Sequence, residues 1–208
     1  DGLTEIVMAH RNELVGQMSV AVAERGIPHR IIGSNSTIAG IIQEHRSIFG
    51  RSFVNPDAKC SVGSVQTIVA RREQLKQWGH QVDRWTCDES HHLAFNGANS
   101  PNTWAQAALM FPNARGLGVT ACPQRADGKG LGRHHDGLMD VMVVGPNMRD
   151  LIDMGALSDF EFSIPSSDFE IAEDAITAGG DYSPAKMKDA SKRSHIVGDV
   201  VVEYIARA

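Results

Sequence analysis

The stretch TEIVMAHRNELVGQMSVAVAERGIPHRIIG, residues 4–33, decides the fold class of this chain. It opens with a short apolar run at residues 4–9, which predicts a buried strand. Residues 10–25 then repeat apolar side chains at helical spacing, and Gly26 follows as a residue that readily adopts the positive φ of a helix end. The run at residues 29–33 predicts a second strand. The stretch therefore reads as a strand, a helix and a strand in succession.

The same alternation continues along the chain. Further strands are predicted at residues 60–65, 84–89, 115–120 and 138–144, and helices at residues 36–49, 66–78 and 103–110. Residues 151–165 predict a short helix, a turn and a strand, and the tail from residue 186 is mostly helical in character. Alternating strands and helices predict an α/β fold, in which a parallel sheet carries helices on both faces. In such a sheet the chemistry gathers in loops at the carboxyl ends of the strands.

Composition bounds the class of protein. The chain has 208 residues, 42% of them hydrophobic, and a formal net charge of −5, so it has no global field that would attract a polyanion. Its three cysteines form no CxxC pair, which is typical of a reducing compartment. No apolar run approaches the roughly 20 residues that cross a bilayer, and no basic and apolar leader opens the chain. These features predict a cytoplasmic protein without a membrane partner.

An acidic pair stands at the end of one predicted strand, in the run Asp-Glu-Ser-His-His at residues 88–92. Adjacent carboxylates there can divide labour, one holding Mg²⁺ through water and one activating an attacking water. The alternative without a catalytic role is a solvated acidic turn. A third interpretation makes Cys87, His91 and His92 ligands of zinc, but no CxxC or HxxxH companion supports it. The run His-His-Asp at residues 134–136 has the same weakness and is expected in a surface loop.

The neighbours of the acidic pair carry a family resemblance. Residues 9–14 (AHRNEL) resemble motif Ia of superfamily-two DExH/DEAD-box helicases, residues 64–68 (SVQTI) the segment that comes next, residues 88–92 (DESHH) motif II, and residues 118–125 (GVTACPQR) motif III. The run DGKGLG at residues 127–132 is similar to that of the phage- and prophage-type branch. Residues 151–157 and 196–201 extend the likeness, so it covers essentially the whole chain.

The resemblance implies a fold and partners. It implies the first RecA-like motor domain of a P-loop NTPase at residues 1–190, and a connecting helix at residues 191–208 that leads to a second RecA-like domain in a longer parent. It also implies ATP and Mg²⁺ as cofactors and nucleic acid as partner, with DNA favoured over RNA.

The resemblance further implies roles for single residues. Asp88 would position Mg²⁺ and Glu89 would activate the water that attacks the γ-phosphate. Residues expected to couple nucleotide state to strand movement are His91, Thr120, Ala121 and Arg125. Residues expected at the nucleic-acid backbone are His10, Arg11, Asn12, Ser64, Gln66 and Thr67. Two departures from the family pattern, Ser90 for alanine and Cys122 for threonine, preserve side-chain size and leave these roles possible.

One family motif does not occur in the sequence. The loop GxxxxGK[ST], whose amides and lysine cradle phosphates, is absent from the 208 residues. In the family it precedes the strand that here opens the chain, so the sheet is expected to be incomplete at its N-terminus, with exposed apolar faces. The chain is expected to be part of an ATP-dependent helicase or translocase. By itself it is expected to be inactive as an ATPase. The alternative is a non-catalytic module that binds nucleic acid or protein, and a metal-dependent hydrolase ranks third.

Overall fold

The computed structural model describes residues 2–95, 100–122, 124–125, 128–161, 171, 175, 182–193, 201 and 204–206. Five strands are present: β1 (Glu5–Ala9), β2 (His29–Ile32), β3 (Cys60–Ser64), β4 (Arg84–Cys87) and β5 (Arg115–Gly118). The helices are α1 (Asn12–Glu24), α2 (Asn35–Phe49), α3 (Val65–Ala70), α4 (Arg72–Gly79), η1 (Ser90–His92), α5 (Thr103–Leu109), η2 (Arg133–His135), α6 (Met148–Asp153) and α7 (Pro184–Arg193). The chain divides into two compact units, Asp1–Val141 and Met142–Ala208. None of the helices in the described part of the chain is long and apolar enough to cross a membrane.

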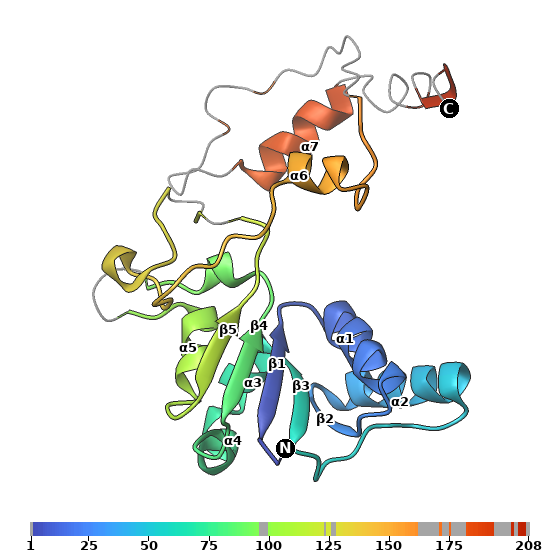
Figure 1. Ribbon diagram of the computed structural model, residues 1–208, viewed down its shortest axis with the longest axis vertical. Coiled ribbons are helices and arrows are strands. Elements are labelled where there is room, and N and C mark those ends of the chain that lie inside the picture. The colour runs from blue at the N-terminus through green and yellow to red at the C-terminus, as the bar shows by residue number, and fades with distance from the viewer. Residues whose placement is uncertain are drawn as a thin grey trace. The chain divides into compact units, whose positions relative to one another are not determined.

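The first unit is built on one parallel sheet with strand order β2-β3-β1-β4-β5 (Figure 1). β1 lies at its centre, where Met8 is in register with Gly63 of β3 on one side and with Cys87 of β4 on the other. β5 pairs with β4 and forms one edge, and its Leu117 is 58% exposed. Parallel order throughout requires a crossover after each strand, which the helices between strands supply.

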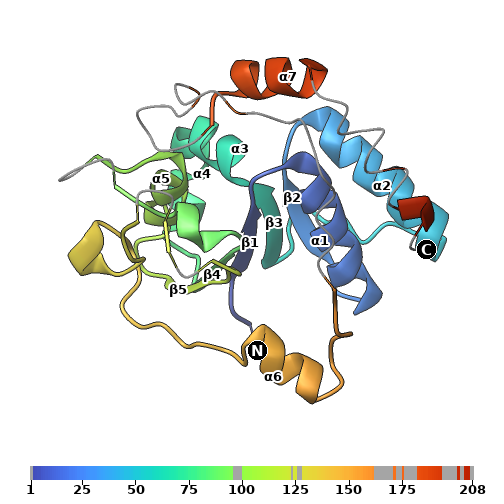
Figure 2. The same cartoon turned by 90° about the horizontal axis from the view of Figure 1, so that it is seen from above.

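Helices cover both faces of this sheet (Figure 2). α1 and α2 lie on one face over a core that includes Val15, Ile31 and Val62. α3, α4 and α5 lie on the other face over a larger core that includes Ile32 and Ile68. The alternation of side chains along a strand explains this division, since neighbours such as Ile31 and Ile32 point to opposite faces. The predicted α/β fold, a parallel sheet with helices on both faces, is therefore confirmed.

The connections reverse direction between β1 and β4. From β1 the chain winds through α1 and α2 toward the β2 edge, whereas from β3 it crosses through α3 and α4 to β4 and continues outward to β5. β1 and β4 are neighbours whose following segments leave in opposite directions, so a crevice opens beyond their carboxyl ends. The ends of these two strands carry the residues of predicted motifs Ia and II.

The elements differ from the sequence-based prediction at two places. The helix predicted at residues 66–78 is two helices, α3 and α4, separated at Arg71. The run at 138–144 is not a strand: Met139 makes one isolated bridge, and Val143 is 91% exposed without a ladder partner in the described chain. The β-branched composition favoured a strand, but a strand exists only where a neighbour pairs with it. Two predictions lie outside the described residues: the strand that ends residues 151–165, and most of the connecting helix at 191–208.

Candidate active site at the ends of β1 and β4

A cleft of about 450 Å³ lies at the reversal between β1 and β4. Its walls come from the loop and helix after β1 and from the loop after β4, with one side chain of α5. The residues that line it are His10, Arg11, Glu13, Leu14, Glu89, His91, His92 and Trp104. The cleft thus joins residues of predicted motifs Ia and II, which the sequence separates by nearly eighty positions.

The acidic pair sits in a strained turn directly after β4. The backbone N–H of Asp88 donates to the Met8 carbonyl at 3.2 Å, which continues the β1–β4 pairing by one residue. Glu89 has φ of 50°, in the left-handed region, and its N–H donates to Asp88 Oδ1 at 2.9 Å. A left-handed non-glycine residue costs on the order of 1 kcal/mol and is retained where the surrounding contacts impose it. The turn aims the two carboxylates differently: Asp88 is half-buried and Glu89 is exposed.

His91 joins this turn to the end of β5. Its Nδ1 lies 2.8 Å from Thr120 Oγ1 and 3.3 Å from Glu89 Oε2. Because the Thr120 hydroxyl proton is directed at the Cys122 carbonyl, Thr120 Oγ1 accepts from His91 Nδ1–H. The Thr120 hydroxyl in turn donates to the Cys122 carbonyl at 3.2 Å and accepts from the Cys122 N–H at 3.0 Å. Predicted motifs II and III are therefore in direct contact through Glu89, His91 and Thr120.

Small residues allow that contact. Ser90 is buried, and its N–H donates to the Val119 carbonyl at 3.0 Å. A Cβ added to Gly118 would lie 2.6 Å from the Ser90 Cβ. The loops after β4 and β5 can approach this closely only because position 118 has no side chain and position 90 has a small one.

The predicted nucleic-acid residues cluster at the ends of β1 and β3. His10 Nδ1 lies 2.7 Å from Gln66 Nε2, so the amide donates to the imidazole. Arg11, Asn12 and Gln66 are exposed. Ser64 is buried and caps α3, accepting from the Thr67 N–H at 3.2 Å and donating to Thr67 Oγ1 at 2.7 Å. The hydroxyls of Ser64 and Thr67 thus also hold the helix start, and their contact with a strand stays a prediction.

The remaining predicted coupling residues lie after β5. Ala121 is exposed, and Arg125 is half-buried with one guanidinium N–H donating to the His135 carbonyl at 2.6 Å. The structure therefore places Arg125 against the segment around η2. Its role in coupling stays a prediction.

A family model describes the same region. The model of the type III restriction enzyme res subunit family, ResIII, matches residues 4–125, more than half of the chain and the whole span from β1 to Arg125. The chain belongs to this family. ResIII domains are RecA-like domains of the superfamily-two helicase-like ATPases, so this is a helicase-related motor domain. No curated protein matches the chain.

Within this ResIII domain the residues fit Mg²⁺ better than zinc. No three His, Cys, Asp or Glu side chains of the described residues are grouped so that they could hold a metal ion. Burial, and then the charge of Asp88, raises the pKa of the Cys87 thiol to about 12, and its Sγ donates to the Asp88 carbonyl. A thiol held protonated is a poor zinc ligand. Asp88 offers a single carboxylate, which suits an ion that keeps most of its water and is held mainly by phosphate.

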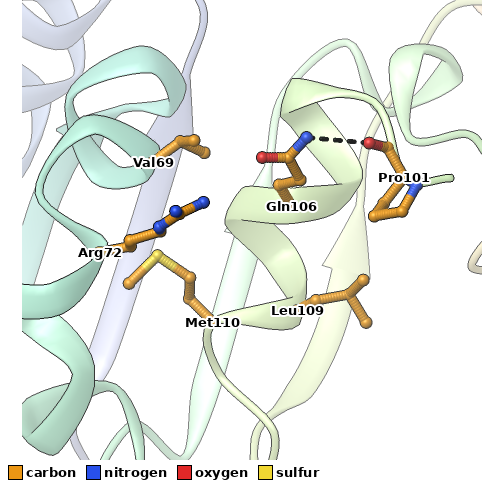
Figure 3. Close-up of a pocket in the computed structure, with 6 residues that line it drawn as sticks. All are labelled: Val69, Arg72, Pro101, Gln106, Leu109 and Met110. Atoms are coloured by element: carbon orange, nitrogen blue, oxygen red, sulfur yellow. Dashed lines mark hydrogen bonds between the residues drawn. The ribbon is translucent and has the colours of Figure 1, made fainter.

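A second hollow of about 230 Å³ lies between α3, α4 and α5 (Figure 3). Its lining is mostly apolar, and Gln106 Nε2 donates to the Pro101 carbonyl at 2.9 Å along its rim. The residues that line it are Val69, Arg72, Pro101, Gln106, Leu109 and Met110. None of them is a predicted site residue and none carries a carboxylate, so the cleft between β1 and β4 is the candidate site.

The sequence did not single out Trp104. Its indole is 8% exposed and stacks on His10 on one side and on His92 on the other, with ring centroids 5.2 Å and 5.0 Å apart. In the sequence it is one apolar residue of a short helix. No period or spacing distinguishes it from an ordinary core side chain, so only the fold shows that it lies in the cleft.

Proposed function

We propose that this ResIII domain is part of an ATP-dependent helicase or translocase that moves along nucleic acid. The observation that carries the proposal is the contact of Glu89 and Thr120 with the same imidazole nitrogen of His91. Through it, a carboxylate suited to activating water is tied to the loop after β5. A displacement of either loop changes the position of the other, as a motor requires.

The residues divide the chemistry as follows. Glu89, exposed in the cleft, is suited to orient and deprotonate the water that attacks a terminal phosphate. Asp88 would hold Mg²⁺ through water, and that ion when bound offsets the negative charge of the phosphates. His91 helps to keep the Glu89 carboxylate in place, because its Nδ1 lies 3.3 Å from Oε2.

The nucleic acid is proposed to lie across the ends of β1 and β3. Arg11, Asn12 and Gln66 are exposed there and carry donors suited to phosphate and sugar oxygens. Backbone contacts carry no sequence information, which suits stepping along any strand. We propose DNA in preference to RNA and, on the run DGKGLG at residues 127–132, the phage-type branch of the helicases.

The 208 residues alone are proposed not to turn ATP over. They contain no GxxxxGK[ST] string, and without its amides and lysine the phosphates lose most of their contacts. Hydrolysis is therefore proposed for a longer protein in which that loop precedes Asp1 and a second RecA-like domain follows Ala208.

The test is Mg²⁺-dependent ATP hydrolysis by that longer protein and its Glu89→Gln variant. Loss of the general base is expected to lower kcat by about 10²-fold or more, because the amide cannot take the proton. Glu24→Gln, an exposed glutamate at the far end of α1, is the matched control and should leave kcat unchanged. A Glu89→Gln variant as fast as the wild type would remove Glu89 from the reaction.

The second candidate is a degenerate motor domain that binds nucleic acid without turnover. Its basis is the exposed donors of Arg11, Asn12 and Gln66, which can hold a strand without bound nucleotide. It predicts that this chain binds single-stranded DNA and that no natural longer form hydrolyses ATP. A natural reading frame that continues upstream into GxxxxGK[ST] would count against it.

A further inference from the structure

Three aromatic rings form a stack through the candidate site. The Trp104 indole lies between the imidazoles of His10 and His92, nearly parallel to the first at 16° and tilted 29° from the second. His92 continues onto His91 with ring centroids 4.1 Å apart. The two histidines that flank Trp104 are exposed, whereas the indole between them is buried. Trp104 is therefore an internal bridge between two groups at the surface of the cleft.

Each ring of the stack is held by a separate element. His10 follows β1 and accepts from the Gln66 amide of α3 at 2.7 Å. Trp104 belongs to the first turn of α5, whose cap Asn102 accepts from the Ala105 N–H at 2.9 Å and donates from Nδ2 to the His92 carbonyl at 2.7 Å. α5 is thus fastened directly to the loop after β4. The indole cannot shift far without moving that loop.

The contacts form a continuous chain across the carboxyl edge of the sheet. From end to end its members are Gln66, His10, Trp104, His92, His91 and Thr120. Gln66 is exposed at the proposed nucleic-acid surface, and His91 also holds Glu89. Trp104 is the member at which the two halves meet.

We propose that Trp104 is a positioning residue that links the nucleic-acid surface at Gln66 and His10 to the Glu89–His91 pair. The proposal deepens the proposed function and rests on it for the identity of the ligand. A close-packed ring transmits displacement because it has no space to absorb it. Indole has two broad faces and reaches both imidazoles, whereas an aliphatic chain of smaller area cannot stack on either.

The experiment follows the imidazole NMR signals of His91 and His92 in this chain. The first arm needs no ligand: Gln66→Ala is introduced into the wild type and into Trp104→Leu. We expect Gln66→Ala to shift the His92 signals in the wild type, and the shift to fall by about threefold or more in Trp104→Leu, since coupling through a shared contact is non-additive. Trp78→Leu is the matched control, because Trp78 packs edge-on against Phe111 outside the stack. It should leave the Gln66→Ala shift intact.

The second arm adds a single-stranded oligothymidine. In the wild type we expect shifts at His10, His92 and His91; in Trp104→Leu the shift at His10 persists while those at His91 and His92 shrink by a similar factor. Circular dichroism and cooperative unfolding identify variants that have lost the fold. If Trp104→Leu has lost the fold, Trp104→Phe replaces it.

The outcomes separate the two claims. If Gln66→Ala shifts the His92 signals equally in the wild type and in Trp104→Leu, the positioning role is overturned. This holds whatever the result with the oligonucleotide. A first arm that succeeds while the oligonucleotide shifts no signal supports the link and contradicts the nucleic-acid part of the proposed function.

Discussion

Among single residues, Gly118 sets the distance between the two loops that carry the candidate chemistry. A Cβ there would lie 2.6 Å from the Ser90 Cβ and 2.7 Å from the Met139 Cε. Both contacts are shorter than real Cβ atoms show, so the loop after β4 must move away from β5 if position 118 gains a side chain. The His91–Thr120 hydrogen bond spans this same junction.

Gly118→Ala is therefore expected to destabilise the fold by about 1–3 kcal/mol through overpacking. Urea unfolding measures this difference. Gly40→Ala is the matched control: Gly40 lies within α2 with no atom near its missing Cβ, and alanine there should be neutral or stabilise by about 0.5–1 kcal/mol through helix propensity. A Gly118→Ala variant as stable as Gly40→Ala would show that the loops are not tightly opposed.

The sequence provided candidate residues for the chemistry but could not predict the contacts between them. The order of the motif-like runs brought Asp88, Glu89, His91 and Thr120 forward as candidates, and the parallel-sheet pattern implied that strand ends share an edge. The shared imidazole nitrogen of His91 depends on side-chain geometry that no spacing encodes. The position of Trp104 in the cleft could not be predicted for the same reason.

Among the elements, α1, β2 and α2 are joined by a buried polar network. Ser19 Oγ lies 2.6 Å from His29 Nε2 and 3.1 Å from His45 Nε2. His29 Nδ1 donates to the Ile27 carbonyl, so its Nε2 accepts from Ser19; His45 Nδ1 accepts from the Phe53 N–H, so its Nε2 donates to Ser19. One hydroxyl thus satisfies two neutral imidazoles, and each proton in the network has a defined place.

Removing that hydroxyl should be costly. Ser19→Ala leaves one buried acceptor and one buried donor without a partner, and we expect a loss of about 1–3 kcal/mol in the free energy of unfolding. Ser61→Ala is the contrasting control, because the buried Ser61 Oγ has no hydrogen-bond partner in the described chain. It should be neutral or stabilising. Equal losses for both variants in urea titrations would refute the network.

The same network predicts a pH dependence. Burial lowers the pKa of both His29 and His45, with each group's unfolded value near 6.5. The unfolded chain therefore binds more protons below that pH, so the stabilisation is complete above about pH 6.5 and falls as the pH drops below it. Urea unfolding at pH 8 and pH 5 measures the change. It should shrink in His45→Gln and persist in His80→Gln, an exposed position; an equal pH dependence in both variants would contradict this origin.

The strands show where sequence patterns suffice. All five strands fall within the predicted runs. In β1, β2 and β3 this is because apolar residues in short runs are buried on both faces of a parallel sheet, whereas β5 is an exposed edge strand. The sequence has no glycine or proline at the break between α3 and α4 at Arg71, so the break could not be predicted. The run at 138–144 has the composition of a strand but no strand pairs with it in the described chain. Both features depend on tertiary neighbours.

For the whole molecule, the predicted catalytic and nucleic-acid residues all lie in one compact unit, Asp1–Val141. They gather at one edge of one sheet, although they come from three separate stretches of the sequence. With a net charge of −5, attraction for nucleic acid must come from local donors near Arg11 and Gln66 and not from the overall field. We therefore propose that nucleic acid binds, and ATP is hydrolysed, at the carboxyl ends of neighbouring β-strands.

The most direct test of that account is the rate of Mg²⁺-dependent ATP hydrolysis with and without single-stranded DNA, measured on the longer protein that carries GxxxxGK[ST] upstream of these residues. A motor is predicted to hydrolyse ATP several-fold faster when the strand is present, on the order of the effects of allosteric coupling. A folded longer protein that hydrolyses no ATP with any strand would contradict the account and leave this ResIII domain as a binding module.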